Sequence, residues 1–519
     1  MRKRAAFLLS ALPLLAFAQT DDVIREDTLE ELTVTSHSAQ SRIEEVQVGV
    51  EKIDVSTMAK VPALFGERDI LKNLQLLPGV KSESEGSSGY QVRGGTSAQN
   101  LILLDGATIY NAGHLMGLFS AFNDNALGNA SLYKGLVPAQ YGGATSSVFD
   151  ISTRSGDSEQ HHLKGTIGLL STQLTVDGPI QKDKSSYLAA FRRSYLDLFL
   201  KATKEYKDNT LNFYDANIQL NLLAGPHDRL TLSFYRGRDN MGLEDLMDMA
   251  WGNTSVNGHW LHTANDHLYL HTAMTYSDFS DDVGIDMLNI YYQMKGFIRH
   301  LTFLHDQTWS PTRSYSLKYG LSSTYLQLQS AEWDVNLLHQ REKRDAWVNA
   351  VWANQEWKVS NLLNLSAGLR LHLFSVLGGQ PYYVINSEGE ITQTLHPSSG
   401  SIVKTYADVE PRFSANLRIN QFNSIKAGFS RTTQDIHAIR GSSMSMPFDR
   451  YTMTSNILHP EQADQVAIGW NTITATGKYD FSAEAYYKQI KNVYDYRDGK
   501  SFHSEIEIER LLLGGKGRA

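Results

Sequence analysis

The sequence contains no cysteine among its 519 residues. A chain without cysteine forms neither disulfides nor thiolate metal sites, which excludes a small disulfide-stapled secreted domain. The chain also lacks an excess of basic residues, since its net charge is −8 and its isoelectric point is about 6.1. Because there is no basic field to attract phosphates, we expect no nucleic-acid partner.

Long hydrophobic runs are also missing beyond the first 18 residues. Those residues have a basic start, Met1–Arg4, an apolar stretch and the small-residue site Ala16-Phe17-Ala18. This pattern is typical of a secretory signal peptide and is too short for a membrane helix, which needs about 20 apolar residues. We therefore exclude residues 1–18 from the fold and place the mature chain outside the cytoplasm. No cysteine follows the site, so we expect no lipid anchor there.

Aromatic residues, in contrast, are abundant. The chain has 25 Tyr, 20 Phe and 8 Trp, although its mean hydropathy is only −0.32. A polar average without a membrane helix is compatible with a transmembrane β-barrel, in which only every second residue of a strand faces lipid. A soluble, secreted β-rich protein has the same composition, so composition alone leaves both open.

Strict alternation of apolar and polar residues begins near residue 160. One face of residues 363–373 carries Leu363, Leu365, Ala367, Leu369, Leu371 and Leu373, and residues 412–430 repeat the pattern as a hairpin around a short turn. Period-two alternation predicts β-strands. Strands of about ten residues, with short turns at one end and long polar loops at the other, favour a barrel over a soluble sandwich or propeller.

The polar face of these strands carries charged residues, namely Arg370, His372, Arg412 and Arg418, and we expect it to line a hydrated lumen. Aromatic residues near strand ends, Phe429, Trp470 and Tyr487, suit the aromatic girdles of a membrane interface. We therefore predict a mainly β fold, in which residues 157–519 form an antiparallel transmembrane barrel.

The region before the barrel divides into two parts. Residues 19–43 are acidic and then rich in Ser and Thr, which predicts a flexible arm with one β-prone patch. Residues 44–156 predict a small α+β domain. Its one convincing helix follows Asp69, which can cap it, carries apolar residues at helical spacing, and stops at Pro78-Gly79.

Several glycine motifs follow this helix in a fixed order. Arg93-Gly94-Gly95 precedes the apolar run Leu101–Leu104, and Asp105-Gly106 predicts a two-residue type I′ turn. Residues 131–156 then contain a Tyr-Lys-Gly and the motif Tyr141-Gly142-Gly143. Here the chain resembles the plug domain of TonB-dependent outer-membrane receptors, with LLPGV, QVRGG, LLDG, LYKG and YGG in the family's order. In the barrel region, EPRFSA and SIKAGFSRTTQDIH resemble strands of the Bacteroidetes-type members.

The resemblance implies a 22-stranded barrel filled by the plug, and energy transfer from a TonB-type protein that adds a strand to a short N-terminal box. The best local match for that box is Glu31-Leu32-Thr33-Val34-Thr35. About 360 residues follow the plug, enough for 13 or 14 strands at the usual spacing. We therefore expect an incomplete barrel, which is the product of a truncated or fragmentary sequence.

The plug motifs have mainly structural interpretations. We expect Gly94, Gly95, Gly106, Gly142 and Gly143 to allow positive φ or close approach, with Asp105 and Tyr141 completing their turns. We expect Arg93 to pair with a carboxylate on the plug or on the barrel wall, because a buried guanidinium needs a partner.

Candidate catalytic chemistry is sparse. The histidines at 259, 262, 267 and 271, and the pair His161-His162, show no fixed ligand spacing, so we predict neither a metal site nor a cofactor. No GxSxG, HExxH or P-loop motif occurs, and we predict no enzymatic activity.

The leading hypothesis is a TonB-dependent receptor in the outer membrane of a Gram-negative cell. Its partners would be a TonB-type protein, outer-membrane lipid and a scarce, bulky nutrient, and the short arm before the plug favours a metal chelate such as a siderophore. Two alternatives remain open. One is a surface binding or adhesion protein that uses the barrel as an anchor, and the other is a secreted β-rich enzyme acting on polysaccharide.

Overall fold

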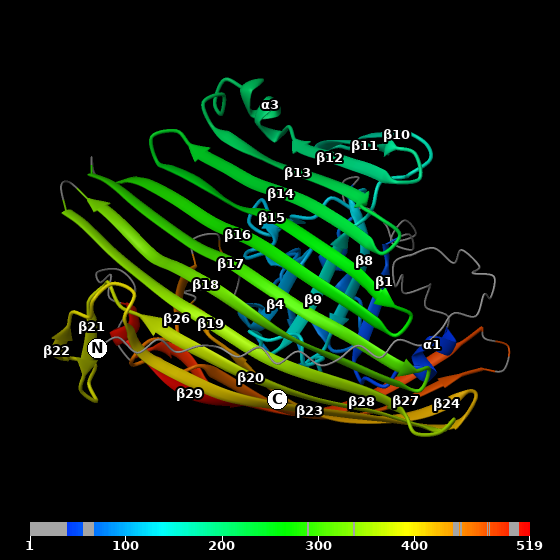
Figure 1. The fold of residues 1–519 in the computed structure, drawn as a ribbon. Coiled ribbons are helices and arrows are strands. Elements are labelled where there is room, and N and C mark those ends of the chain that lie inside the picture. The colour runs from blue at the N-terminus through cyan, green and yellow to red at the C-terminus, as the bar shows by residue number, and fades with distance from the viewer. Residues whose placement is uncertain are drawn as a thin grey trace, which may run out of the picture. The chain divides into compact units, whose positions relative to one another are not determined.

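The computed structural model describes residues 39–55, 67–287, 290–335, 338–439, 446, 449–474, 476, 478–497 and 508–519. All of them lie in one compact unit that spans Ser36–Ala519. Its two main parts are a small N-terminal region, which we call the plug (β1 to β9), and a large antiparallel sheet, which we call the wall (β10 to β29). In Figure 1 the wall curves around the plug. No helix within the described ranges is long and apolar enough to cross a membrane.

The plug is built on a five-stranded sheet in the order β1-β8-β9-β4-β5, in which only β4 and β9 run parallel. Two strand pairs, β2-β3 and β6-β7, accompany it. The strands are β1 (Val50–Asp54), β2 (Val80–Ser82), β3 (Tyr90–Val92), β4 (Asn100–Leu104), β5 (Ala107–Thr108), β6 (Gly113–His114), β7 (Phe119–Ser120), β8 (Leu127–Tyr133) and β9 (Ser147–Thr153). The helices are α1 (Ala39–Glu44), α2 (Ile70–Leu74) and the 3-10 turn η2 (Ser97–Gln99).

Helix α2 begins where the sequence predicts. The Asp69 carboxylate caps it by accepting hydrogen bonds from the backbone N–H of Leu71 (2.8 Å) and Lys72 (3.1 Å). The same side chain also accepts from the N–H of Ser120 (2.8 Å), which ties the helix to β7. The helix ends at Leu74, before the expected stop, because the N–H groups of Leu76 and Leu77 bond to the carbonyls of Asn73 and Leu74 in turns tighter than an α-helix. Gly79, with φ of 79°, then turns the chain into β2.

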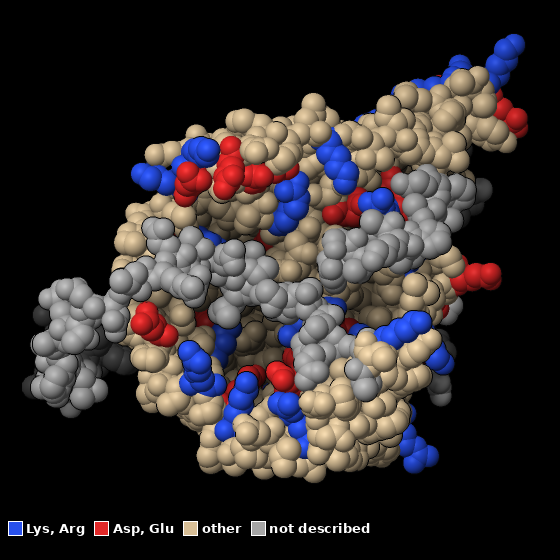
Figure 2. Space-filling view, turned by 90° about the vertical axis from the view of Figure 1, so that its right-hand side faces the viewer, with Lys and Arg blue, Asp and Glu red and all other residues tan. Residues whose placement is uncertain are grey.

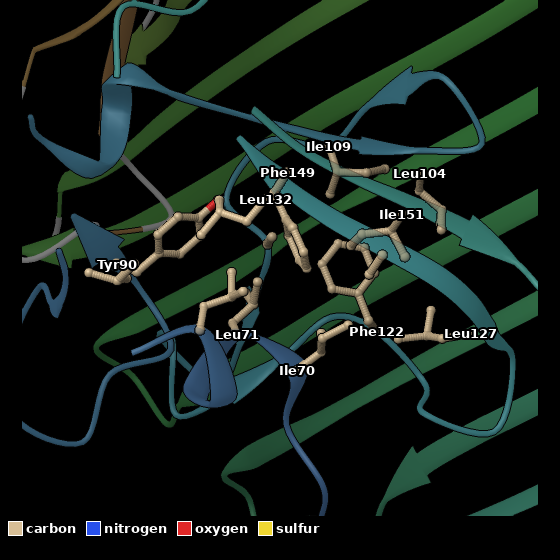
Figure 3. Close-up of a cluster of buried hydrophobic side chains, with 14 of the residues drawn as sticks. Ile70, Leu71, Tyr90, Leu104, Ile109, Phe122, Leu127, Leu132, Phe149 and Ile151 are labelled. Carbon is tan, nitrogen blue, oxygen red and sulfur yellow. The ribbon is translucent and has the colours of Figure 1, made fainter. Parts of the chain in front are cut away.

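The plug has a hydrophobic core of its own. Figure 3 shows side chains from α2, β3, β4, β8 and β9 that converge between the helix and the sheet. Ile70 and Leu71 of α2 pack there with Leu132 and Phe149 of the sheet, and all four are at most 2% exposed. One wall residue, Tyr235, joins this core. The plug therefore has an apolar core to which the wall contributes one buried side chain.

The wall is a 16-stranded sheet in which each strand pairs with its neighbours along the chain. Its strands are β10 (His162–Ile167), β11 (Ser171–Gln181), β12 (Ser185–Ser194), β13 (Thr210–Leu223), β14 (Asp228–Leu243), β15 (Met247–Asn265), β16 (Leu268–Met287), β17 (Ile290–Thr312), β18 (Tyr315–Val335), β19 (Leu338–Lys358), β20 (Leu363–Leu377), β23 (Ile402–Asn420), β24 (Asn423–Gln434), β27 (Glu461–Ile473), β28 (Asp480–Tyr496) and β29 (Leu512–Arg518). Within the described residues, β10 and β29 are its edges.

The expected count of 13 or 14 strands was therefore wrong. Several connections are much shorter than the average that the count assumed: residues 266–267 join β15 to β16, residues 313–314 join β17 to β18, and residues 421–422 join β23 to β24. Such tight turns leave more of the chain for strands, so the same length of sequence builds 16 of them.

Connections at the two ends of the wall differ in length. The tight turns at residues 266–267, 313–314 and 421–422 all lie at one end. The other end carries longer insertions, including α3 (Leu196–Lys201), the hairpin β21 (Tyr382–Ile385) with β22 (Ile391–Leu395), the hairpin β25 (Ile436–Ile439) with β26 (Arg450–Met453), and the turn η3 (Ile508–Leu511). In outer-membrane barrels short turns face the periplasm and long loops face outward. We therefore call the two ends of the wall the short-turn end and the outward end. Figure 2 looks onto the short-turn end, where basic and acidic side chains gather in a hollow.

Candidate functional site at the plug–wall interface

Arg93 lies at one of several polar contacts between the plug and the wall. Its guanidinium is 2% exposed, and it donates to Glu484 Oε2 of β28 (2.6 Å) and to the backbone carbonyl of Lys134 (2.6 Å). Lys134 Nζ, also 2% exposed, lies 3.2 Å from Glu51 Oε1 and 3.6 Å from Glu484 Oε2. Two buried cations thus share the wall carboxylate of Glu484, and Lys134 has the plug carboxylate of Glu51 as a second partner. Charges removed from water need such partners.

The two glycines after Arg93 redirect the chain beside this cluster. Gly94 has φ of 71°, and Gly95 N–H donates to the Val92 carbonyl (2.9 Å). The Ser146 hydroxyl donates to the same carbonyl (2.8 Å), so that β3 is held to the segment before β9.

A second buried ion-pair network ties the start of the plug to the wall. Arg192 of β12 donates through Nε to Asp215 of β13 (2.6 Å) and through Nη1 to Glu67 of the plug (3.2 Å). Its Nη2 donates to the Ser120 carbonyl (2.8 Å). Burial raises the pKa of Glu67 and exceeds the opposing effect of Arg192. One guanidinium therefore connects two plug segments to two wall strands.

The outward apex of the plug, residues 111–120, is held by a wall carboxylate. Asp239 of β14 contacts His114 Nδ1 (2.6 Å) and accepts from the Leu115 N–H (2.7 Å). The His114 ring stacks on Phe213 with centroids 4.3 Å apart. Burial lowers the pKa of His114, but the attraction of Asp239 and hydrogen bonds to Asp215 and Asp239 outweigh it, so the pKa is raised.

The Asp105-Gly106 turn touches the wall near its short-turn end. Both residues have positive φ, 50° and 80°, as a type I′ turn requires. The Asp105 carboxylate accepts from Thr153 N–H (2.7 Å), and its backbone carbonyl contacts His259 Nε2 (3.0 Å). A carbonyl only accepts, so His259 Nε2 carries the hydrogen and its Nδ1 accepts from His271 Nε2 (3.0 Å).

The Tyr141-Gly142-Gly143 segment packs against the inner face of the wall. The Tyr141 hydroxyl donates to Asp150 of β9 (2.6 Å), and burial raises the pKa of both groups. A Cβ on Gly142 would lie 2.7 Å from Arg370 Nε, which explains the absence of a side chain there. Gly143 has φ of 81°.

The polar face of the wall is not the hydrated surface that we expected. Arg370 and Arg412 are buried and donate to backbone carbonyls of plug residues 137–140. His372 is buried against Asp435, and Arg418 pairs with Glu44 (3.4 Å). Plug carbonyls therefore accept from Arg370 and Arg412, whereas Asp435 and Glu44 are the partners of His372 and Arg418.

Two sequence predictions concern the energy-coupling box and the histidines. The segment Glu31-Leu32-Thr33-Val34-Thr35 lies outside the described residues. The histidines do not converge as a group. His259 and His271 contact each other, but His262 contacts Asp228, His267 contacts the Ser310 carbonyl, and His162 contacts Asp157. Within the described part of the chain, no three His, Cys, Asp or Glu side chains gather as a metal site would need.

Several interface residues were missed from the sequence: Glu51, Glu67, His114, Lys134, Arg192, Asp215, Asp239 and Glu484. The available signal was a charged residue on the polar face of a strand, as for Arg192. That signal indicates an inward side chain but does not identify its partner, which here comes from a segment over a hundred residues away.

The sequence of this chain matches two family models, in agreement with the plug and the wall seen in the structure. Residues 45–148 match the TonB-dependent Receptor Plug Domain, and residues 109–504 match the TonB dependent receptor-like beta-barrel. The chain belongs to the TonB-dependent receptors. The receptor is therefore an outer-membrane transport protein and not an enzyme, and it works with TonB and binds small-molecule ligands.

Three solved structures of similar fold are distant from this chain in sequence. The receptor superposes on the hemophore receptor HasR of Serratia marcescens with a TM-score of 0.65 at 14% identity, covering 92% of this chain and 78% of that one. It superposes on the copper transporter OprC with a TM-score of 0.63 at 13% identity, covering 87% of this chain and 74% of that one. On the ferric yersiniabactin uptake receptor FyuA of Yersinia pestis the TM-score is 0.61 at 13% identity, covering 86% of this chain and 72% of that one. A search of curated proteins finds no match. At such identities the likeness establishes the fold.

Proposed function

We propose that this receptor imports a scarce, bulky nutrient through energy-coupled rearrangement of the plug, and that a metal chelate such as a siderophore is the favoured cargo. The observation that carries the proposal is the nature of the plug–wall interface. The plug has its own apolar core, while its contacts with the wall include ion pairs and hydrogen bonds centred on Arg93, Arg192, Asp239 and His259. Polar contacts exchange for water at low net free energy, so a pull shifts the plug without unfolding it.

The proposed site of the pull is Glu31–Thr35. Its sequence is β-prone and adjoins the acidic arm, which suits pairing with an edge strand of a TonB-type protein. We propose the corresponding division into a signal peptide (1–18), an arm (19–43), a plug (44–156) and a transmembrane wall in outer-membrane lipid (157–519). The preference for a metal cargo is supported by the names of three neighbours in fold, which refer to copper, heme and ferric yersiniabactin.

Uptake in whole cells tests the proposal. The chain and a variant lacking residues 30–35 are expressed in the outer membrane and offered a panel of radiolabelled ferric siderophores, heme and corrinoids. We expect energy-dependent accumulation of at least one compound by the chain, and surface binding without accumulation by the variant. Equal accumulation by both would refute the assignment of the box, and binding that never leads to uptake in either would favour the adhesion alternative.

A further inference from the structure

Methionine is concentrated at one place in the receptor. Five of the chain's twelve methionines belong to a single cluster, which we call the thioether cluster: Met116, Met241, Met247, Met249 and Met294, packed with Trp251, Val283 and Ile285. The plug core, by comparison, is built from Ala, Ile, Leu, Val, Phe and Tyr. A well-packed interior does not require methionine, so its accumulation here calls for a chemical reason.

Strand register places four of these residues in one row across the wall. Met241 of β14 lies directly opposite Met249 of β15, Met249 lies opposite Val283 of β16, and Val283 lies opposite Met294 of β17. Residues that oppose each other on neighbouring strands have Cβ atoms about 4.5–5.5 Å apart. Met247 is two residues from Met249 and shares its face of β15. Thioethers from three adjacent positions, Met241, Met247 and Met249, therefore converge.

The plug adds a fifth thioether from its apex. Leu115 and Met116 have φ of 50° and 56°, followed by Gly117 at 85°. Two consecutive non-glycine residues with positive φ are unusual, and such conformations gather at ligand clamps. Asp239 holds this backbone through the Leu115 N–H (2.7 Å), and the turn brings Met116 onto the row.

One part of the thioether cluster is buried and the other part is accessible to solvent. Met249, Trp251 and Met294 are at most 9% exposed, whereas Met116, Met241 and Met247 are partly exposed. It lies beside the connection 244–246, at the outward end of the wall where a ligand arrives. Three exposed carboxylates surround that connection, on Glu244, Asp245 and Asp248. Negative charge at an entrance attracts cations.

The donor atoms specify which cation. Thioether sulfur is neutral and soft, and it selects soft metals such as Cu⁺. Hard or borderline ions need carboxylates or imidazoles, and the described residues contain no group of three such side chains. The imidazole of His114, two residues before Met116, is already engaged with Asp239. Trp251, on the same face as Met249, adds an aromatic ring that can face a cation.

We propose that the thioether cluster is a binding site for a soft monovalent metal ion, Cu⁺ or its analogue Ag⁺, formed jointly by the wall and the plug apex. The site departs from the siderophore cargo favoured above, because thioethers select a soft ion rather than Fe³⁺, and it depends on the proposed function only in the step from binding to import. Because Met116 belongs to the plug, movement of the plug withdraws one ligand and weakens the site, which would release the ion inward.

Silver binding to the full chain in detergent tests the site. We expect Ag⁺ to bind stoichiometrically in calorimetry, with sulfur as its neighbour in X-ray absorption, and Zn²⁺ not to bind there. The double substitution Met241→Leu/Met249→Leu preserves volume and apolarity but removes two thioethers. We expect it to weaken Ag⁺ binding at least tenfold, and Met116→Leu to weaken it by a smaller factor.

The matched control is Met274→Leu, because Met274 lies on β16 but is 57% exposed on the other side of the wall. It should bind Ag⁺ as the unmodified chain does. If the double variant binds Ag⁺ as tightly as the control, the site is wrong, whatever happens to uptake. If Ag⁺ binding depends on the methionines but removal of residues 30–35 leaves Ag⁺ uptake unchanged, the metal site is correct and the proposed coupling of uptake to residues 31–35 is wrong.

Discussion

Replacing Glu484 with Gln removes the wall carboxylate that Arg93 and Lys134 share. Both cations are 2% exposed. After the substitution Lys134 keeps Glu51 as a partner, whereas Arg93 loses its carboxylate and keeps the Lys134 carbonyl. Removing one partner of a fully buried ion pair destabilises a protein by about 3–5 kcal/mol. The Glu484 side chain is 24% exposed, and water compensates for part of the loss. We therefore expect a loss of about 2–3 kcal/mol in the free energy of local plug opening.

Hydrogen exchange measures this loss directly. The Lys134 amide donates to the Gly49 carbonyl (2.9 Å) and should exchange about 30- to 150-fold faster in Glu484→Gln, since 1.36 kcal/mol corresponds to a factor of ten. The control is Asp464→Asn, which removes the partner of Arg431 from an ion pair within the wall, whose side chains are 35% and 27% exposed. Exposed pairs contribute at most about 1 kcal/mol, so plug exchange should not change. Equal plug exchange rates in the two variants would refute this account of the interface.

Three further predictions concern the plug. Gly142→Ala places a Cβ about 2.7 Å from Arg370 Nε and should lower the thermal midpoint, with a cost of about 1–3 kcal/mol for overpacking; an unchanged midpoint would contradict the close approach. Gly106→Ala, at φ of 80°, should cost about 1–2 kcal/mol in denaturant unfolding, whereas Gly165→Ala, at an open position, should cost less. The raised pKa of His114 means that its contribution to the stability of the apex is complete below its ordinary value of 6.5 and disappears as pH rises through the folded-state value. After correction for the intrinsic base catalysis of amide exchange, protection of the apex amides should fall in that window, and it should be independent of pH in His114→Asn.

The sequence predicted the local elements well where they depend on local chemistry. The alternation from Leu363 to Leu373 corresponds to β20, the pattern in 412–430 forms the β23–β24 hairpin, and Asp69 caps α2. The Asp105-Gly106 turn has the positive φ values that its residues favour. Each of these features depends on residues a few positions apart.

The contacts that define the interface could not be predicted in this way. Arg93 and Glu484 are 391 positions apart, and Arg192 and Glu67 are 125 apart. Which charges meet depends on strand register and on how the plug sits within the wall. For the same reason, the strand face that carries Arg370 and Arg412 was expected to be hydrated. Nothing in the sequence of their own strands reveals that plug carbonyls lie opposite these residues.

Cross-linking the plug to the wall tests the central claim that import requires plug movement. A Cβ on Gly368 of β20 would lie 3.0 Å from the Ala139 Cβ of the plug, close to the separation of about 3.5–4.5 Å in disulfides. Since the chain has no cysteine, Ala139→Cys/Gly368→Cys forms one defined bond. We predict that the oxidised variant binds its ligand at the cell surface but does not accumulate it, and that reduction restores energy-dependent uptake. Uptake at the unmodified rate by fully cross-linked receptor would contradict the account.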